Sequence, residues 1–482
     1  MIFPTFTFAC FFLAVFAGFW YIFRRKTDRK IFLIAASYLF YAAWDWRFCF
    51  LLLFSTGINY GFGYLVGTRK DHLWRKLFMV LSVIANVLLL GFFKYYTAFA
   101  THLNALVRYF SSSAEVSSVP FALPVISVLL PVGISFYTFK GMSYVFDVYL
   151  CRMPPVKSFA DIMLYISFFP QLASGPIVHA NEFLPQIDPA VAAGIEPGSR
   201  PIRFDRASAL SVSGLFKKMV AANFISTLLV DPVLADPALF NTLEVFLATV
   251  GYSAVIYADF SGYSDLAIGI ALLLGFNTPD NFNRPYISFS VTDFWRRWHI
   301  TFSSWLREYL YFAFGGSRFG LRRTLFALVA TMVLGGLWHG ASLTFVVWGL
   351  MQGIGLALER LFNYGRNRSG TPWKAALQIT GTFFFVTVSW AVFRAPGFDY
   401  LVHLFASFGN IGVPRSVSLP VPVFLMILVL AVQFIPRSFR KSSMACWTSV
   451  PIIGKGIALG LFFALLSVIG MSGIAPFIYF QF

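Results

Sequence analysis

The sequence contains repeated apolar stretches of about twenty residues with few or no charges, such as 2–23, 77–93 and 452–471. A helix of ~20 apolar residues is long enough to cross the hydrocarbon core of a bilayer. Only helices and closed barrels satisfy their backbone hydrogen bonds there. Of the 482 residues, 58% are hydrophobic and 12% are charged, whereas soluble domains carry ~25% charged residues. The sequence therefore predicts an all-α polytopic membrane protein and excludes a soluble globular one.

The formal net charge is +17, from 37 Lys and Arg against 20 Asp and Glu. In a soluble protein such an excess suggests nucleic-acid binding, but membrane proteins concentrate Lys and Arg in cytoplasmic loops. Segments 24–30 and 69–76 hold five and four basic residues, whereas 98–120 and 395–419 hold one each. We therefore place the first pair of loops inside and the second pair outside. The expected partners of these charges are membrane lipids, with no nucleic acid.

With residue 1 outside, the pattern predicts about 11 to 12 transmembrane helices in a single integral-membrane domain, 1–482. Its core is expected at about 121–394, followed by C-terminal helices in 395–482. The predicted crossings are 3–23, 31–44, 48–67, 77–97, 121–150, 208–230, 243–275, 324–338, 341–362, 375–394, 418–435 and 452–472.

Two stretches, 158–174 and 277–323, fit this list poorly and are expected to be re-entrant or interfacial. Irregular backbone at membrane depth is tolerated only where protein buries it or water lines it. These segments therefore predict an internal cavity.

Residues 290–310 have the periodicity of one amphipathic helix, begun by Ser290 or Thr292. The polar arc carries the arginines and suits either lipid phosphates or the phosphates of an anionic donor. The apolar arc includes a histidine, which lipid binding does not explain. The apolar arc contains Trp295, Trp298, His299, Phe302 and Trp305, and the arginines are Arg296, Arg297 and Arg307.

The strongest candidate for chemistry is His339, which lies between glycines in the run Gly335–Gly340. Ionisable residues in membrane segments are functional candidates by default. A histidine here is suited to act as a general base, or else it is a core residue bonded to a carbonyl. His299 is the second candidate, either orienting an acyl donor or holding a developing charge, or simply packing.

Asp259 and Asp265 lie inside a predicted crossing, where they form either a proton relay or hydrogen bonds between helices. Lys217 and Lys218 are interpreted as positive residues at the inner end of a crossing. No HxxH or HExxH spacing occurs, so no metal site is predicted.

Seven runs in order resemble the membrane-bound O-acyltransferase family, most closely its alginate O-acetyltransferase branch, which also acetylates peptidoglycan and cellulose. The resemblance covers about residues 1–410. The runs are Pro131–Phe139, Tyr165–Gln171 together with Ser174–Ile177, Gly214–Lys218, Tyr257–Asp265, Asn281–Tyr286, Asp293–His299 and Gly336–Gly340.

The resemblance implies helices around a central tunnel, with His339 as the catalytic histidine and His299 as its companion. It implies acetyl-CoA as a cytoplasmic acyl donor, a polysaccharide acceptor and an extracytoplasmic acetyltransferase partner at a bacterial inner membrane. We expect the tunnel to be lined by Trp338, Asp259, Asp265, Trp295 and Trp298.

Two alternatives remain open at this point. One is D-alanyl transfer from an acylated carrier protein toward teichoic acid. The other is a proton-coupled transporter or flippase that uses Asp259 and Asp265, with His339 as a structural residue.

Overall fold

The computed structural model describes residues 3–112, 122–126, 128–187, 202–362, 371–412 and 419–469, and these residues form helices and connecting loops without any strand. Within these described ranges, seven helices are long and apolar enough to cross a membrane, or eight if the bent pair α19 and α20 counts as one span. The predicted all-α, multi-pass class is confirmed.

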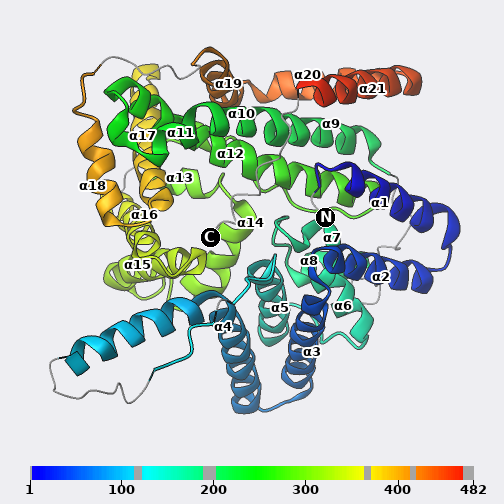
Figure 1. The fold of residues 1–482 in the computed structure, drawn as a ribbon. Coiled ribbons are helices and arrows are strands. Elements are labelled where there is room, and N and C mark those ends of the chain that lie inside the picture. The colour runs from blue at the N-terminus through cyan, green and yellow to red at the C-terminus, as the bar shows by residue number, and fades with distance from the viewer. Residues whose placement is uncertain are drawn as a thin grey trace.

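The first half of the chain forms helices over most of the predicted N-terminal crossings (Figure 1). The elements are α1 (Phe6–Ala17) with η1 (Gly18–Ile22), α2 (Lys26–Asp45), α3 (Arg47–Thr68), α4 (His72–Ser112), α5 (Ile134–Tyr149), α6 (Phe159–Ser167), α7 (Phe169–Leu172), α8 (Ala180–Phe183) and η2 (Leu184–Gln186).

The second half begins with one long helical stretch that alternates α- and π-helical turns, α9 (Phe204–Leu215), η4 (Phe216–Ala222), α10 (Asn223–Ile225), η5 (Ser226–Val230) and α11 (Asp231–Ala235). The remaining elements are η6 (Pro237–Leu239), α12 (Thr242–Leu273), η7 (Pro285–Ile287), α13 (Val291–Trp295), α14 (Ile300–Trp305), η8 (Leu306–Tyr311), α15 (Gly320–His339), α16 (Leu343–Leu361), α17 (Pro372–Arg394), α18 (Phe398–Ser407), α19 (Pro420–Ala431), η9 (Val432–Phe434), α20 (Arg437–Ser449) and α21 (Ile452–Ile469).

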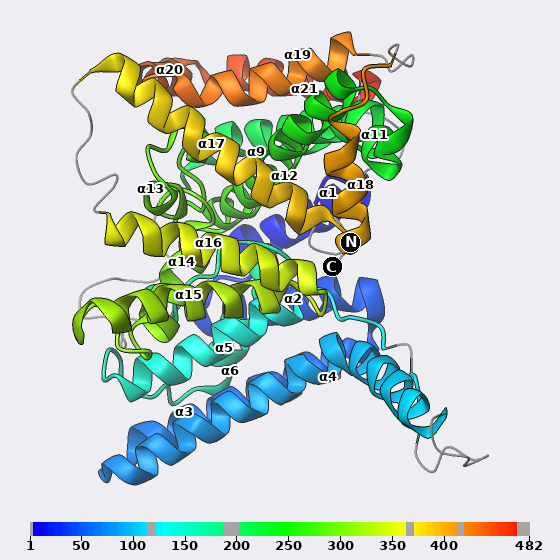
Figure 2. The same cartoon turned by 90° about the vertical axis from the view of Figure 1, so that its left-hand side faces the viewer.

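Helix α12 is the buried centre of one half of the molecule. It begins at a capping box formed by Asn241 and Glu244 and packs against α9, α17 and α19. Helices α3, α4 and α5 form the opposite side, and α13 and α14 lie between the two groups in both views (Figures 1 and 2). The short irregular helices are therefore enclosed by long ones.

Helices α15 and α16 form a close antiparallel pair because glycines line their contact. A Cβ atom at Gly336 would overlap the carbonyl oxygen of Phe345, and one at Gly349 would overlap the carbonyl oxygen of Met332. This contact places His339, the last residue of α15, beside Phe345 of the next helix, with ring centroids 6.1 Å apart.

The predicted crossing at 121–150 is helical only from Ile134 onward, so its first part is wrong. In this predicted crossing, the described residues before Ile134 (122–126 and 128–133) lack regular structure except for a turn at Val132 and Gly133. Pro124 and Pro131 have no N–H to donate to a helix, and Gly133 adopts φ = 75°, which glycine tolerates without strain. The helix consequently begins one residue after this turn.

The predicted single helix over 290–310 is also wrong, although Ser290 is confirmed as its N-cap, accepting from the Asp293 N–H at 3.1 Å. The helix breaks before α14 because His299 adopts φ = 41°. A left-handed non-glycine residue costs about 1–3 kcal/mol and persists only where its surroundings enforce it. Here the Ile300 N–H donates to the Asn281 carbonyl (2.9 Å), and the Asn283 N–H donates to the Arg297 carbonyl (2.9 Å).

We predict that Gly336→Ala lowers the thermal midpoint of the detergent-solubilised protein, since overpacking typically costs about 1–3 kcal/mol. The matched control is Gly381→Ala in α17, where an added Cβ meets nothing within 4 Å. Equal midpoints for the two variants would show that the α15–α16 contact is not close-packed.

Candidate functional site

His339 is 3% exposed and lies in a pocket of aromatic rings. Its ring centroid is 4.6 Å from Trp338, 4.9 Å from Phe393 and 5.2 Å from Trp348. Helix α15 ends at this histidine, where Gly340 continues as extended backbone. The helix end therefore presents the imidazole inside the protein and away from bulk water.

His299 is brought to the same region by the break before α14. It is 1% exposed and stacks on Phe302 with a centroid separation of 5.0 Å. Phe302 in turn stacks on Trp338 at 4.5 Å and contacts the His339 ring at 6.4 Å. Both predicted histidines thus contact one phenylalanine ring, although 40 positions separate them in the sequence.

Two residues of α4 that sequence reasoning missed hold the end of α15. The Lys94 ammonium donates to the Trp338 carbonyl at 2.5 Å, and the Tyr95 hydroxyl donates to the Leu337 carbonyl. Carbonyls in the last turn of a helix lack intrahelical donors, and a cation there also complements the helix dipole. A lysine inside a predicted crossing was the available signal in the sequence.

Two cavities lie along α15. The larger, about 740 Å³, is lined by Thr324, Leu328, Thr331 and Met332 of α15 and by the arginines Arg296, Arg307 and Arg360. The smaller, about 70 Å³, lies at the other end and is lined by Lys94, Trp338, His339 and the segment 130–136. Thr324 and His339 are separated by about 22 Å of helix at 1.5 Å per residue.

The arginines of the large cavity have no ion-pair or hydrogen-bond partner within the described part of the chain, while the acids beside them are engaged. Asp293 pairs with Arg297 (2.9 Å), and Glu359 accepts from the backbone N–H groups of Val291 and Thr292. Arg297, a predicted phosphate contact, therefore lies in an ion pair outside the cavity lining. Arg360 of α16, which the sequence did not suggest, takes a place in that lining.

Asp259 and Asp265 are both ion-paired. The buried Asp259 contacts Lys218, and Asp265 contacts Lys217 (2.6 Å) and the Ser213 hydroxyl (3.0 Å). These lysines lie within a helical stretch instead of at its inner end, and Lys218 is buried. The two ion pairs join η4 to α12. They correspond to the alternative in which these aspartates form bonds between helices.

The two predicted lining tryptophans are placed differently. Trp295 lines the large cavity, and its indole N–H donates to Gln352 at 3.0 Å. Trp298 is 1% exposed and packs against Trp390, 5.0 Å away, in the core. Among the residues that the structure describes, no group of three or more His, Cys, Asp or Glu side chains is arranged to hold a metal ion.

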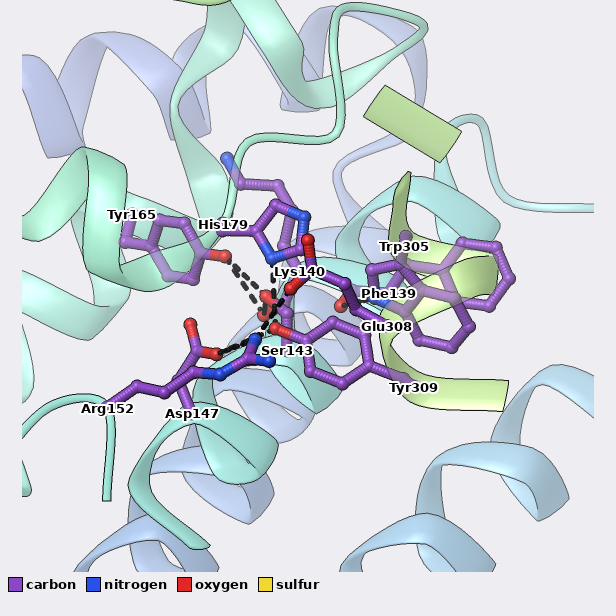
Figure 3. A network of polar contacts seen from close by, with 10 residues as sticks. All are labelled: Phe139, Lys140, Ser143, Asp147, Arg152, Tyr165, His179, Trp305, Glu308 and Tyr309. Carbon is purple, nitrogen blue, oxygen red and sulfur yellow. Dashed lines mark hydrogen bonds and ion pairs between the residues drawn. The ribbon is translucent and has the colours of Figure 1, made fainter. Parts of the chain in front are cut away.

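A polar network that is buried at Asp147, His179 and Tyr309 joins α5 to η8 (Figure 3). The Tyr309 hydroxyl donates to Asp147 at 2.8 Å and accepts from His179 Nδ1 at 2.9 Å. Arg152 bridges Asp147 (3.4 Å) and Glu308 (2.6 Å). Because Arg307 in the same helical turns lines the large cavity, this network positions one wall of that cavity.

Comparison with known proteins gives the chain its family. Residues 150–398, which include both histidines and the whole lining of the large cavity, match the model of the membrane-bound O-acyltransferase family. The chain belongs to that family. It is therefore an O-acyltransferase, and the transporter or flippase alternative is set aside.

Individual proteins are similar to this chain outside the motif runs as well. A probable alginate O-acetylase of Pseudomonas putida is 34% identical over 100% of both chains, so the similarity continues past residue 410. A peptidoglycan O-acetyltransferase of Helicobacter pylori is 33% identical over 77% of this chain and 72% of its own length. A teichoic acid D-alanyltransferase of Bacillus subtilis is 25% identical over 56% of this chain and 69% of its own length.

We predict that Tyr309→Phe lowers the free energy of unfolding by about 1–3 kcal/mol, because buried Asp147 and His179 each lose a hydrogen-bond partner. Thermal denaturation in detergent measures the change. Tyr311→Phe in the same helical turns is the control, since no hydrogen bond of the Tyr311 hydroxyl is found among the described residues. Equal stability of the two variants would contradict a structural role for the network.

Proposed function

We propose that this O-acyltransferase moves an acetyl group from cytoplasmic acetyl-CoA to a hydroxyl on the far side of a bacterial inner membrane. The observation that carries the proposal is the pair of cavities along α15, one cationic and one containing His339. Loop charges assign the N-terminal end of α15 to the cytoplasm, because basic residues concentrate on that side. The relatives named for alginate and peptidoglycan support an extracytoplasmic polysaccharide as final acceptor, reached through an extracytoplasmic acetyltransferase partner.

The large cavity has the properties expected of a donor site. Its volume of about 740 Å³ lies within the ~300–1,000 Å³ typical of small-molecule pockets. Arg296, Arg307 and Arg360 offer guanidinium groups that bind phosphate oxygens in a bidentate manner. The phosphates of coenzyme A would remain at these arginines, while the pantetheine arm carries the thioester along α15 toward the histidines.

His339 is assigned as the general base. It takes the proton of the acceptor O–H as that oxygen attacks the thioester carbonyl carbon and forms a tetrahedral intermediate. The C–S bond then breaks, and His339 returns the proton to the leaving thiolate. The products are an O-acetyl ester and a thiol, so no net proton is released. Trp338 and His299 shape the site around this exchange.

D-alanyl transfer from a carrier protein stays the second candidate, because a carrier thioester also ends in a phosphopantetheine arm. The D-alanyltransferase relative shares about half of this chain, whereas the alginate O-acetylase relative shares all of it. This difference favours acetyl transfer. Labelled acetyl-CoA and a labelled D-alanyl carrier, offered to the same proteoliposomes, distinguish the two donors.

We predict that His339→Ala lowers acetyl transfer by about 10²–10⁴-fold without unfolding the protein, as expected for loss of a positioned base. Transfer of label from acetyl-CoA to an acceptor in proteoliposomes measures the rate. The control is His403→Ala, which changes an exposed histidine of α18. Near-wild-type transfer by a folded His339→Ala protein would overturn the assignment.

We predict that Arg296→Ala and Arg307→Ala each raise the KM for acetyl-CoA by about tenfold or more, since a hydrogen bond to a charged group contributes about 1.5–3 kcal/mol. The kcat should change less. Arg437→Ala removes an equal charge from the exposed helix α20 and should leave the KM unchanged. Similar KM values for all three variants would place the donor phosphates elsewhere.

A further inference from the structure

The side chain of Asn281 makes four hydrogen bonds, one of them to His299. Asn281 Oδ1 lies 2.9 Å from His299 Nδ1 and also accepts from the Thr301 hydroxyl (3.0 Å) and the Thr301 N–H (3.3 Å). Asn281 Nδ2 donates to the Ser264 hydroxyl at 3.1 Å. The two Thr301 donors fix Oδ1 as the end of the amide that faces the histidine.

These contacts determine which nitrogen of His299 carries the proton. A carbonyl oxygen only accepts hydrogen bonds, so the hydrogen between Asn281 and His299 belongs to Nδ1. In a neutral imidazole the other nitrogen then presents a lone pair. His299 Nε2 is buried and has no hydrogen-bond partner among the described residues. A buried polar atom without a protein partner is free to bond a substrate group or a water.

We propose that Asn281 is a positioning residue that holds His299 as a hydrogen-bond acceptor, with Nε2 directed at an O–H or N–H group of the reacting substrates. This role rests on the proposed acetyl transfer. Of the roles expected for His299, holding a developing charge would then not apply to the oxyanion of the tetrahedral intermediate, because a lone pair repels an oxyanion. The matching groups are the acceptor hydroxyl and the amide N–H groups of the donor's pantetheine arm.

Among the contacts of His299, the hydrogen bond between Nδ1 and Asn281 has the largest effect on the protonation of the ring. The His299 ring packs against Phe260 of α12 (4.7 Å between ring centroids) and Phe302 (5.0 Å), neither of which titrates. Titratable groups on the packed elements are His339 at the end of α15, and Asp259 and Asp265, each paired with a lysine. Burial lowers the pKa of His299 to about 3, so the ring is neutral at physiological pH.

The test compares pH–rate profiles of acetyl-CoA-dependent transfer for Asn281→Leu, Asn281→Asp and Ser264→Ala in the full-length protein. Asn281→Leu removes the acceptor and should lower the rate about tenfold or more, by analogy with other residues that orient a functional histidine. Asn281→Asp places a carboxylate against Nδ1–H, which raises the pKa of a histidine by about 1–3 units. Its profile should therefore gain an acidic limb displaced to higher pH by that amount.

Ser264→Ala removes the other partner of the same amide and leaves the His299 contact in place, so it should keep the wild-type profile. A purely structural role for Asn281 predicts equal losses for Asn281→Leu and Ser264→Ala and no shift for Asn281→Asp, which would overturn the proposal. Raised KM for the hydroxyl acceptor or for acetyl-CoA in Asn281→Leu identifies which substrate meets Nε2. Unchanged KM values for both substrates would contradict the proposal that Nε2 bonds to one of them.

Nitrogen-15 NMR of histidine-labelled protein tests the tautomer independently of turnover, with the His299 signals assigned by their absence in His299→Gln. The expected spectrum has a protonated Nδ1 and an unprotonated Nε2, and the reverse pattern overturns the inference. Wild-type protein that transfers no acetyl group would contradict the proposed function, while this measurement would still decide the role of Asn281.

Discussion

This structure depends on one constraint. Its helices must break inside an apolar body without leaving backbone groups unsatisfied. A lost backbone hydrogen bond costs several kcal/mol where water is absent. The chain meets this cost with side chains and loops from distant segments. At the break before α14 the Asn281 and Arg297 carbonyls accept from Ile300 and Asn283. At the end of α15 the donors to the last carbonyls are Lys94 and Tyr95.

These two breaks place the two histidines at one ring. The left-handed residue directly before α14 is His299 itself, and the last residue of α15 is His339. Phe302 lies between the two histidines. The interruption of two helices thus produces a site that continuous helices would not form. The glycine contact between α15 and α16 then fixes the second helix end against its neighbours.

Much of the fold followed from the sequence because apolar length and loop charge are strong signals in a membrane protein. Helices occur in the twelve predicted crossings, and the two stretches set apart as irregular do contain short, buried elements. The break at His299 was missed because helical periodicity describes which residues are buried, and Trp295, Trp298 and Phe302 are buried with or without a continuous helix.

The parts of the site that escaped prediction depend on contacts between distant segments. Arg360 of α16 and Arg296 of the loop after α13 share one cavity only because α13 packs on α16. Lys218 is far from solvent because η4 lies against α12. The two lysines, which the sequence suggests lie at the end of a crossing, therefore form ion pairs with α12. Local patterns carry no information on such pairings, whereas His339 stands out locally through its glycines.

We expect donor and acceptor to approach His339 from opposite sides of the membrane. Sealed proteoliposomes with labelled acetyl-CoA confined to one side and a hydroxyl acceptor confined to the other test it directly. We expect acetylated acceptor with wild-type protein in one orientation and none with His339→Ala. Acetylation that occurs only when both substrates share one compartment would contradict it.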